Sequence, residues 1–87
     1  MGTQAIVDII AAHAREVLPD LGTRPLGSAD SLRELGANSI DRAEILVLTT
    51  ATLGLRIPLV ELAQPRNVGE LAKLLSERMA QRGARVA

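Results

Sequence analysis

The side chains that could do covalent chemistry are few, and Ser39 is the one whose surroundings need an explanation. The chain has no cysteine and a single histidine, His13. A serine nucleophile needs a base within hydrogen-bond reach, and nothing in the sequence brings His13 to Ser39. A metal site needs several converging ligands, and His13 has neither a second histidine nor a thiolate to join it. We therefore expect no metal site and no enzyme activity.

Other catalytic patterns are equally weak. Asp41 and Glu44 lie three residues apart near the start of a helical pattern, where carboxylates usually complement the helix dipole. The glycines are scattered and do not form the G-x-x-x-x-G-K phosphate-binding loop. We therefore expect no self-contained catalysis, and Ser39 needs another explanation.

Ser39 directly follows Asn38 at the expected start of a helix. Either residue could cap this helix, and the serine would then be purely structural. Asn38 is itself a first-rank cap, however, so Ser39 would fall at the first helical position with its hydroxyl free. The N–H groups and dipole at a helix N-terminus stabilise a phosphate. A phosphodiester on the Ser39 hydroxyl would lie in that favourable field.

A helix starting at Ser39 carries two apolar strips. The strip expected to face the core consists of Ile45, Leu46, Thr49 and Leu53. A second strip, offset from the first, consists of Ile40, Ala43 and Val47. Its flanking charged residues are Asp41, Arg42 and Glu44. An apolar strip outside the core face suggests a docking surface.

Three long helical patterns and one short one position these residues. The first covers residues 3–18, with Thr3 as its expected cap and Pro19 as its stop. The second runs from about Ser39 to Leu53 and ends at a C-capping Gly54. A single turn over residues 59–62 follows between two prolines. No strand-like alternation competes, so we predict an all-α four-helix bundle.

The last helix begins at Asn67, an expected cap with Glu70 as its capping-box partner. Its predicted buried face consists of Val68, Leu71, Leu74 and Leu75. Residues 19–38 predict a long first loop, which Leu26, Leu32 and Leu35 could pin to the core. We expect one domain over residues 1–87, ordered over about 3–80, with a tail over 82–87 that frays.

The composition of the chain argues against nucleic acid and membranes as partners. The chain has 87 residues, with ten basic and ten acidic side chains and no aromatic residue. It therefore lacks both the basic footprint and the stacking platform of a nucleic-acid binder. No apolar stretch is long enough to cross a membrane, and the N-terminus lacks the pattern of a signal peptide. We expect a soluble, cytoplasmic monomer that binds neither nucleic acid nor membrane.

The segment DSLRELGANSIDRAEIL, residues 30–46, resembles the signature of acyl carrier proteins. That signature is D-S-L-x-x-L-G, followed by Asp-Ser-Leu and an acidic residue. Two later segments resemble the same family: LGLRIPLVEL its loop into a short third helix, and NVGELAKLL its final helix. The resemblance covers nearly the whole chain, and the order, the spacing and all four helices agree.

This resemblance implies a cofactor and a set of site residues. Ser39 matches the serine that carries 4′-phosphopantetheine, an arm transferred from coenzyme A by a Mg²⁺-dependent phosphopantetheinyl transferase. Acyl groups are then carried as thioesters on the thiol of the arm. Ile40, Ala43 and Val47 match the exposed partner-binding strip of the family, and Glu44 a common acidic contact. The full partner surface expected from these matches is Asn38, Ile40, Asp41, Arg42, Ala43, Glu44 and Val47.

Departures from the general signature suggest a narrower group. Asn38 replaces the usual aspartate, and Arg42, Thr50 and Ala51 make the second helix less acidic than in carriers of fatty acid synthesis. The phrases GANSIDRAEI and IPLVELA resemble discrete carriers of polyketide β-branching cassettes. Such carriers donate acetyl, formed by decarboxylation of malonyl, to a 3-hydroxy-3-methylglutaryl (HMG) synthase-like enzyme. The implied partners are that enzyme, an acyltransferase and a decarboxylating ketosynthase-like enzyme.

Two other functions remain open from the residues alone. A peptidyl or aminoacyl carrier would use the same serine and the same arm with a different cargo. A small helical interaction domain without a prosthetic group would use only the apolar strip on the second helix. The first alternative differs in the acyl group that is loaded, and the second in having no modification of Ser39.

Overall fold

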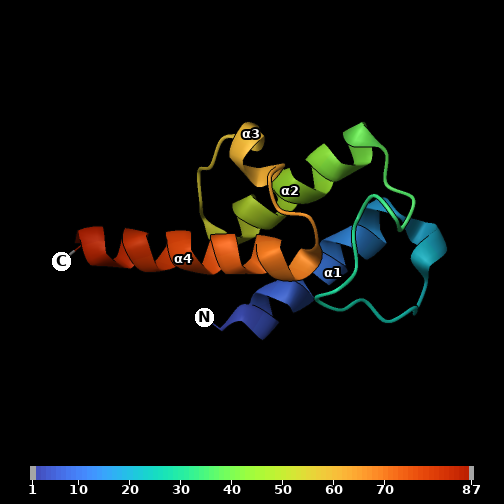
Figure 1. Cartoon of the computed structure of the whole chain (residues 1–87), viewed down its shortest axis with the longest axis horizontal. Coiled ribbons are helices and arrows are strands. Elements are labelled where there is room, and N and C mark those ends of the chain that lie inside the picture. Colours follow the sequence, from blue (N-terminus) through green and yellow to red (C-terminus); the bar gives the residue numbers. More distant parts are fainter. Residues whose placement is uncertain (1, 87) are drawn as a thin grey trace.

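The computed structural model describes residues 2–86, with side chains described as far as Arg82. Over these residues it contains helices, turns and loops but no strand, which confirms the predicted all-α class. The elements are α1 (Thr3–Val17), a short 3₁₀ turn η1 (Pro19–Leu21), α2 (Ser39–Leu53), α3 (Leu59–Leu62) and α4 (Val68–Val86). α1 packs against both α2 and α4, and α3 contacts α2 (Figure 1).

The bounds of α2 follow from its two capping residues. The Asn38 side-chain oxygen accepts a hydrogen bond from the Asp41 N–H at 2.8 Å. The Asp41 carboxylate accepts one from the Asn38 N–H at 3.4 Å, which completes a capping box. At the other end Gly54 adopts φ 68°, the left-handed conformation that a terminating glycine allows. The predicted span Ser39–Leu53 is confirmed at both ends.

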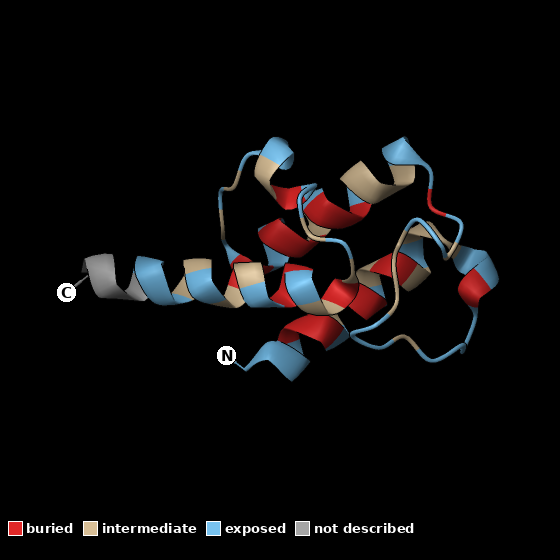
Figure 2. Ribbon diagram, in the orientation of Figure 1, coloured by how far each residue is buried: buried red, intermediate tan, exposed pale blue. Residues whose placement is uncertain are grey.

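The core is aliphatic, and every long helix contributes to it. Ile6 and Ile10 of α1, Ile45 of α2 and Leu75 of α4 are fully buried. The predicted core strip of α2 is buried throughout, Thr49 included. The Thr49 hydroxyl donates to the Ile45 carbonyl at 2.8 Å, so this buried polar group has a partner. In Figure 2 the buried residues, drawn in red, lie where the helices come together.

One helix cap and one capping-box bond differ from the prediction. α1 is capped by the backbone of Gly2 without a side-chain hydrogen bond, so Thr3 is the first helical residue and the prediction of a Thr3 cap is wrong. Asn67 caps α4 as predicted, because its side-chain oxygen accepts from the Glu70 N–H at 2.8 Å. The Glu70 carboxylate accepts from the N–H of Arg66, one residue earlier than a standard capping box.

The C-terminal end of α4 is longer than the sequence predicted. The helix is continuous through Val86, and it extends beyond the other helices in Figure 1. Ala87 lies outside the described residues. The fraying expected over 82–87 stays a prediction.

The long first loop is tied to the start of α4. The backbone N–H of Val68 donates to the Asp30 carbonyl, and that of Gly69 donates to the Ser28 carbonyl, both at 2.8 Å. These bonds satisfy two N–H groups that a helix start otherwise leaves unpaired. Leu26, Leu32 and Leu35 are partly buried against the core, as predicted. The loop that leads into Ser39 is therefore anchored on two sides.

We expect Gly69→Ala to destabilise the protein by about 1–3 kcal/mol, because the added methyl has no room. A Cβ at this position would lie 2.9 Å from the Ser28 Cβ and 3.1 Å from the Ser28 carbonyl oxygen. Gly27→Ala is the control on the other side of this contact, in the first loop beside Ser28, since its Cβ would meet its nearest neighbour, the Asp30 carboxylate, at 4.0 Å. Urea unfolding curves measure both changes. Equal stability of the two variants would contradict the proposed clash.

Candidate functional site

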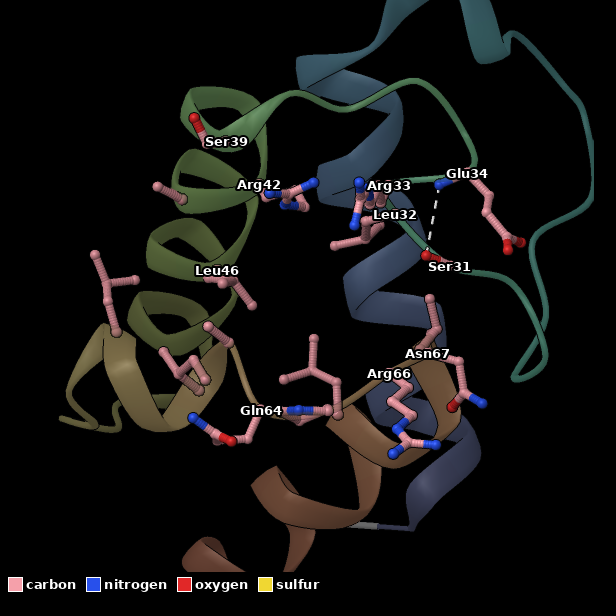
Figure 3. Close-up of a pocket in the computed structure, with 17 residues that line it drawn as sticks. Ser31, Leu32, Arg33, Glu34, Ser39, Arg42, Leu46, Gln64, Arg66 and Asn67 are labelled. Atoms are coloured by element: carbon pink, nitrogen blue, oxygen red, sulfur yellow. Dashed lines mark hydrogen bonds between the residues drawn. The ribbon is translucent and has the colours of Figure 1, made fainter.

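Ser39 is presented at the exposed N-terminal end of α2. It is the first residue of the helix, and the cap is supplied by Asn38. Over the described part of the chain the Ser39 hydroxyl has no hydrogen-bond partner, and it projects away from the helix (Figure 3). In Figure 2 the start of α2 is exposed, and the rest of its first turn is of intermediate burial. As predicted, the cap leaves the serine hydroxyl free for modification.

The surroundings of Ser39 fit a phosphodiester. The Asn38 side chain accepts a hydrogen bond from the Asp41 N–H, and the first backbone bond of the helix runs from the Arg42 N–H to the Asn38 carbonyl. The N–H groups of Ser39 and Ile40 come before these bonds and are not used by them. These groups and the dipole of a 15-residue helix favour an anion at this end. Ser39 is exposed, so a transferring enzyme has open access to its hydroxyl. The site thus meets both requirements of a phospho-linked arm, a free hydroxyl and a field that favours its phosphate.

A groove begins at Ser39 and runs between α2, α3 and the start of α4. Its volume is about 880 Å³. Buried Leu46, Leu62 and Leu71 contribute its apolar part, and arginine side chains are spaced along it (Figure 3). The residues that line it are Ser31, Leu32, Arg33, Glu34, Ser39, Arg42, Ala43, Leu46, Leu59, Leu62, Ala63, Gln64, Pro65, Arg66, Asn67, Val68 and Leu71. The sequence did not predict this groove, because its walls come from segments far apart along the chain.

The second apolar strip of α2 is largely at the surface. Ile40 is 75% exposed and Val47 53% exposed, whereas Ala43 is half-buried and lines the groove. Leu59 and Val60 of α3 are also exposed, and sequence reasoning missed them. A four-residue helix is too short to show periodicity, so the only available signal was two large apolar residues directly after Pro58. We call Ile40, Val47, Leu59 and Val60 the α2–α3 apolar surface.

The polar residues predicted beside this strip differ in whether their side chains already make hydrogen bonds within the protein. Asn38 and Asp41 bond to each other's backbone. Arg42 is partly buried and donates to the Ala37 carbonyl at 3.4 Å. Glu44 is exposed, and its carboxylate has no hydrogen-bond partner among the described residues. Glu44 is therefore the charged side chain of this set most available to a partner.

His13 is engaged far from Ser39. Its Nε2 lies 2.7 Å from the Thr52 hydroxyl, and its Nδ1 lies 3.2 Å from a Glu16 carboxylate oxygen. Thr52 is thirteen residues after Ser39 on the same helix, which is a rise of roughly 20 Å. His13 thus links α1 to α2 through the Thr52 hydroxyl, and it is too distant to act as a base for Ser39.

Two other classes of site were sought in the described residues. No three of their histidine, aspartate and glutamate side chains converge as a metal site would require. None of the helices is both long and apolar enough to span a bilayer.

Comparison with known proteins identifies the family. The family model described as "Phosphopantetheine attachment site" matches residues 8–75. The polyketide biosynthesis acyl-carrier-protein AcpK of Bacillus subtilis (strain 168) is 40% identical over 79 residues, which is 91% of this chain and 96% of that protein. A solved structure, the curacin biosynthetic pathway HMG synthase in complex with acetyl donor-ACP, contains a similar chain. That match has a TM-score of 0.80 and 43% identity, and covers 85% of this chain and 95% of the other.

The match to the family model spans most of the bundle, from α1 to the buried face of α4. It agrees with the free serine hydroxyl at the start of α2 and with the four-helix arrangement around it. The chain therefore belongs to the phosphopantetheine-attachment family, and it is an acyl carrier protein whose prosthetic group is 4′-phosphopantetheine.

Proposed function

We propose that Ser39 carries the arm and that this carrier donates acetyl, derived from malonyl, to an HMG-synthase-like enzyme of polyketide β-branching. The observation that carries the proposal is the likeness, at 43% identity and a TM-score of 0.80, to an acetyl donor carrier solved with an HMG synthase. The relationship to a polyketide carrier from Bacillus subtilis supports the same pathway class.

The residues of this chain divide the task between attachment and recognition. Asn38 caps the helix and so keeps the Ser39 hydroxyl free. The arm supplies a terminal thiol, on which an acyl group is held as a thioester. The α2–α3 apolar surface begins at Ile40, the residue after the attachment point, and its four side chains are 46–75% exposed. An enzyme can cover such side chains with its own apolar residues. Glu44 adds one free negative charge.

The wider set of proposed partners follows from the same role. A phosphopantetheinyl transferase attaches the arm, an acyltransferase loads malonyl, and a decarboxylating ketosynthase-like enzyme leaves acetyl for the synthase-like acceptor. The proposed contact residues are Asn38, Ile40, Asp41, Arg42, Ala43, Glu44 and Val47. Leu59 and Val60 extend this set onto α3. Each partner must approach Ser39, so all of them meet the first half of α2.

The donor role is tested by acetyl transfer in vitro. A broad-specificity transferase and acetyl-coenzyme A load the protein, and intact mass measures acetyl transfer to an HMG-synthase-like enzyme. We expect Val47→Asp to lower kcat/KM for the carrier by at least about tenfold, because docking must then desolvate a carboxylate. Helix content by circular dichroism should stay unchanged, since Val47 is outside the core.

Ala80→Asp is the matched control for this experiment. Ala80 is exposed on α4, so the variant adds the same charge outside the proposed docking surface. We expect its kcat/KM to remain within about twofold of wild type, as for a surface change outside the contact area. No acetyl transfer from the loaded wild-type protein would refute the donor role. Equal kinetics for Val47→Asp and Ala80→Asp would refute the surface assignment.

A further inference from the structure

The groove beside Ser39 is more cationic than the rest of the chain. The whole protein is neutral, with ten basic and ten acidic side chains. The groove is lined by Arg33, Arg42 and Arg66 but by a single carboxylate, that of Glu34. Three guanidinium groups therefore face one carboxylate, which leaves an excess of two positive charges along the groove.

The structure does not neutralise these arginines internally. The salt bridges among the described residues are His13–Glu16 and Arg78–Glu61, and neither involves the groove. Arg42 makes one long hydrogen bond to a backbone carbonyl, and Arg33 and Arg66 are exposed. Unpaired guanidinium groups present several donors in a plane and bind carboxylates in preference to neutral groups. The groove thus offers donors for an anion.

The arginines are arranged along the length of the groove. In Figure 3, Arg42 projects from α2 toward the loop that carries Arg33, whereas Arg66 lies toward the far end, near Asn67. Leu46, Leu62 and Leu71 are buried and line the same groove. A ligand that suits this arrangement has a short apolar part and a terminal carboxylate. A purely apolar acyl group would use none of the guanidinium donors.

We propose that this groove receives the acyl end of the protein's own arm when that acyl group is malonyl, with the malonyl carboxylate bound by the groove arginines. The proposal rests on the proposed attachment at Ser39, which lies at the rim of the same groove. Decarboxylation replaces the malonyl carboxylate by a proton and releases CO₂. The acetyl that remains has no charge for the arginines to bind, so it leaves the groove and becomes available to an acceptor enzyme.

The test measures how well the groove shields each thioester. Apo protein is loaded with malonyl or acetyl from the corresponding coenzyme A by a broad-specificity transferase, and intact mass follows cleavage by hydroxylamine. We expect Arg33→Gln and Arg66→Gln to speed cleavage of the malonyl thioester by about two- to fivefold, the range that exposed ion pairs support. Cleavage of the acetyl thioester should not change. Comparing each cargo across variants removes the difference in intrinsic reactivity between the two thioesters.

Arg56→Gln is the matched control, because Arg56 is exposed and does not line the groove. We expect it to behave as wild type with both cargoes. High salt should remove the protection of malonyl in the wild-type protein, since the screening length falls to about 3 Å at 1 M salt. Arginine side-chain NMR signals of Arg33 and Arg66 should shift in the malonyl form only.

The outcomes separate this inference from the proposed function. Loading at Ser39 with equal malonyl cleavage rates in wild type, Arg33→Gln and Arg66→Gln would overturn the inference and leave the carrier role intact. Protection of malonyl and acetyl alike, insensitive to salt, would also overturn it, because the groove would then recognise only apolar parts. Failure to load Ser39 at all would overturn the proposed attachment as well.

Discussion

Ser39→Ala will abolish the gain of one phosphopantetheine group when the protein is incubated with coenzyme A and a broad-specificity transferase. Wild-type protein will gain that mass once, because it presents one serine at the start of α2. The variant should remain folded, since the α2 cap is the Asn38 side chain and Ser39 is exposed. Intact mass spectrometry measures the result, and circular dichroism checks the fold.

Ser31→Ala is the matched control for this prediction. Ser31 lines the same groove, and its hydroxyl accepts one long hydrogen bond, from the Glu34 N–H at 3.5 Å. It does not lie at a helix start, so we expect the Ser31 variant to be modified as fully as wild type. A mass gain in Ser39→Ala would show that another residue carries the arm. No gain in the wild-type protein would refute the attachment.

Leu75→Ala will destabilise the bundle by about 2–5 kcal/mol, since it leaves a cavity in the middle of the core. Leu75 lies on α4 with no exposed surface. A protein of this length has a total stability of about 4–13 kcal/mol, so the variant loses a large share of it. The melting temperature should fall by at least about 8 °C. Chemical and thermal unfolding measure both quantities.

Leu59→Ala makes the same chemical change at a half-exposed position. Leu59 is 46% exposed on α3, so its truncation removes much less buried area. We expect a loss of less than about 1 kcal/mol. If the two leucine variants were equally stable, the assignment of Leu75 to the core would be wrong.

The fold was predictable wherever the controlling residues are local. Asn38 and Gly54 determine the ends of α2 through their own side chain and backbone conformation, so its bounds followed from the sequence. Helical spacing also assigned Ile45, Leu46, Leu71 and Leu75 correctly to the core, whereas Leu74, predicted on the same buried face of α4, is only partly buried. The start of α1 was not, because Gly2 caps it without a side-chain bond that a sequence pattern would reveal. The burial of Ala11 and Ala14 was also missed, since alanine is common on both faces of a helix.

The candidate site was predictable only in part, for a related physical reason. Ser39 and the exposed Ile40 and Val47 lie on one helix, and helical spacing places them relative to one another. The groove depends on packing between the first loop, α2, α3 and the start of α4. Its arginines are separated by up to 33 positions, from Arg33 to Arg66, and no local pattern brings them together. Such a site requires the tertiary structure.

The packing of α1 against α4 affects when the chain can fold during its synthesis. Ser39 leaves the ribosome while Ile6 and Ile10 still lack Leu75, with which they form the core. Closing the chain between its first and last helices is the slow, entropically demanding contact of this topology. We therefore expect the transferase to meet a folded carrier only after Leu75 has been synthesised and has joined the core.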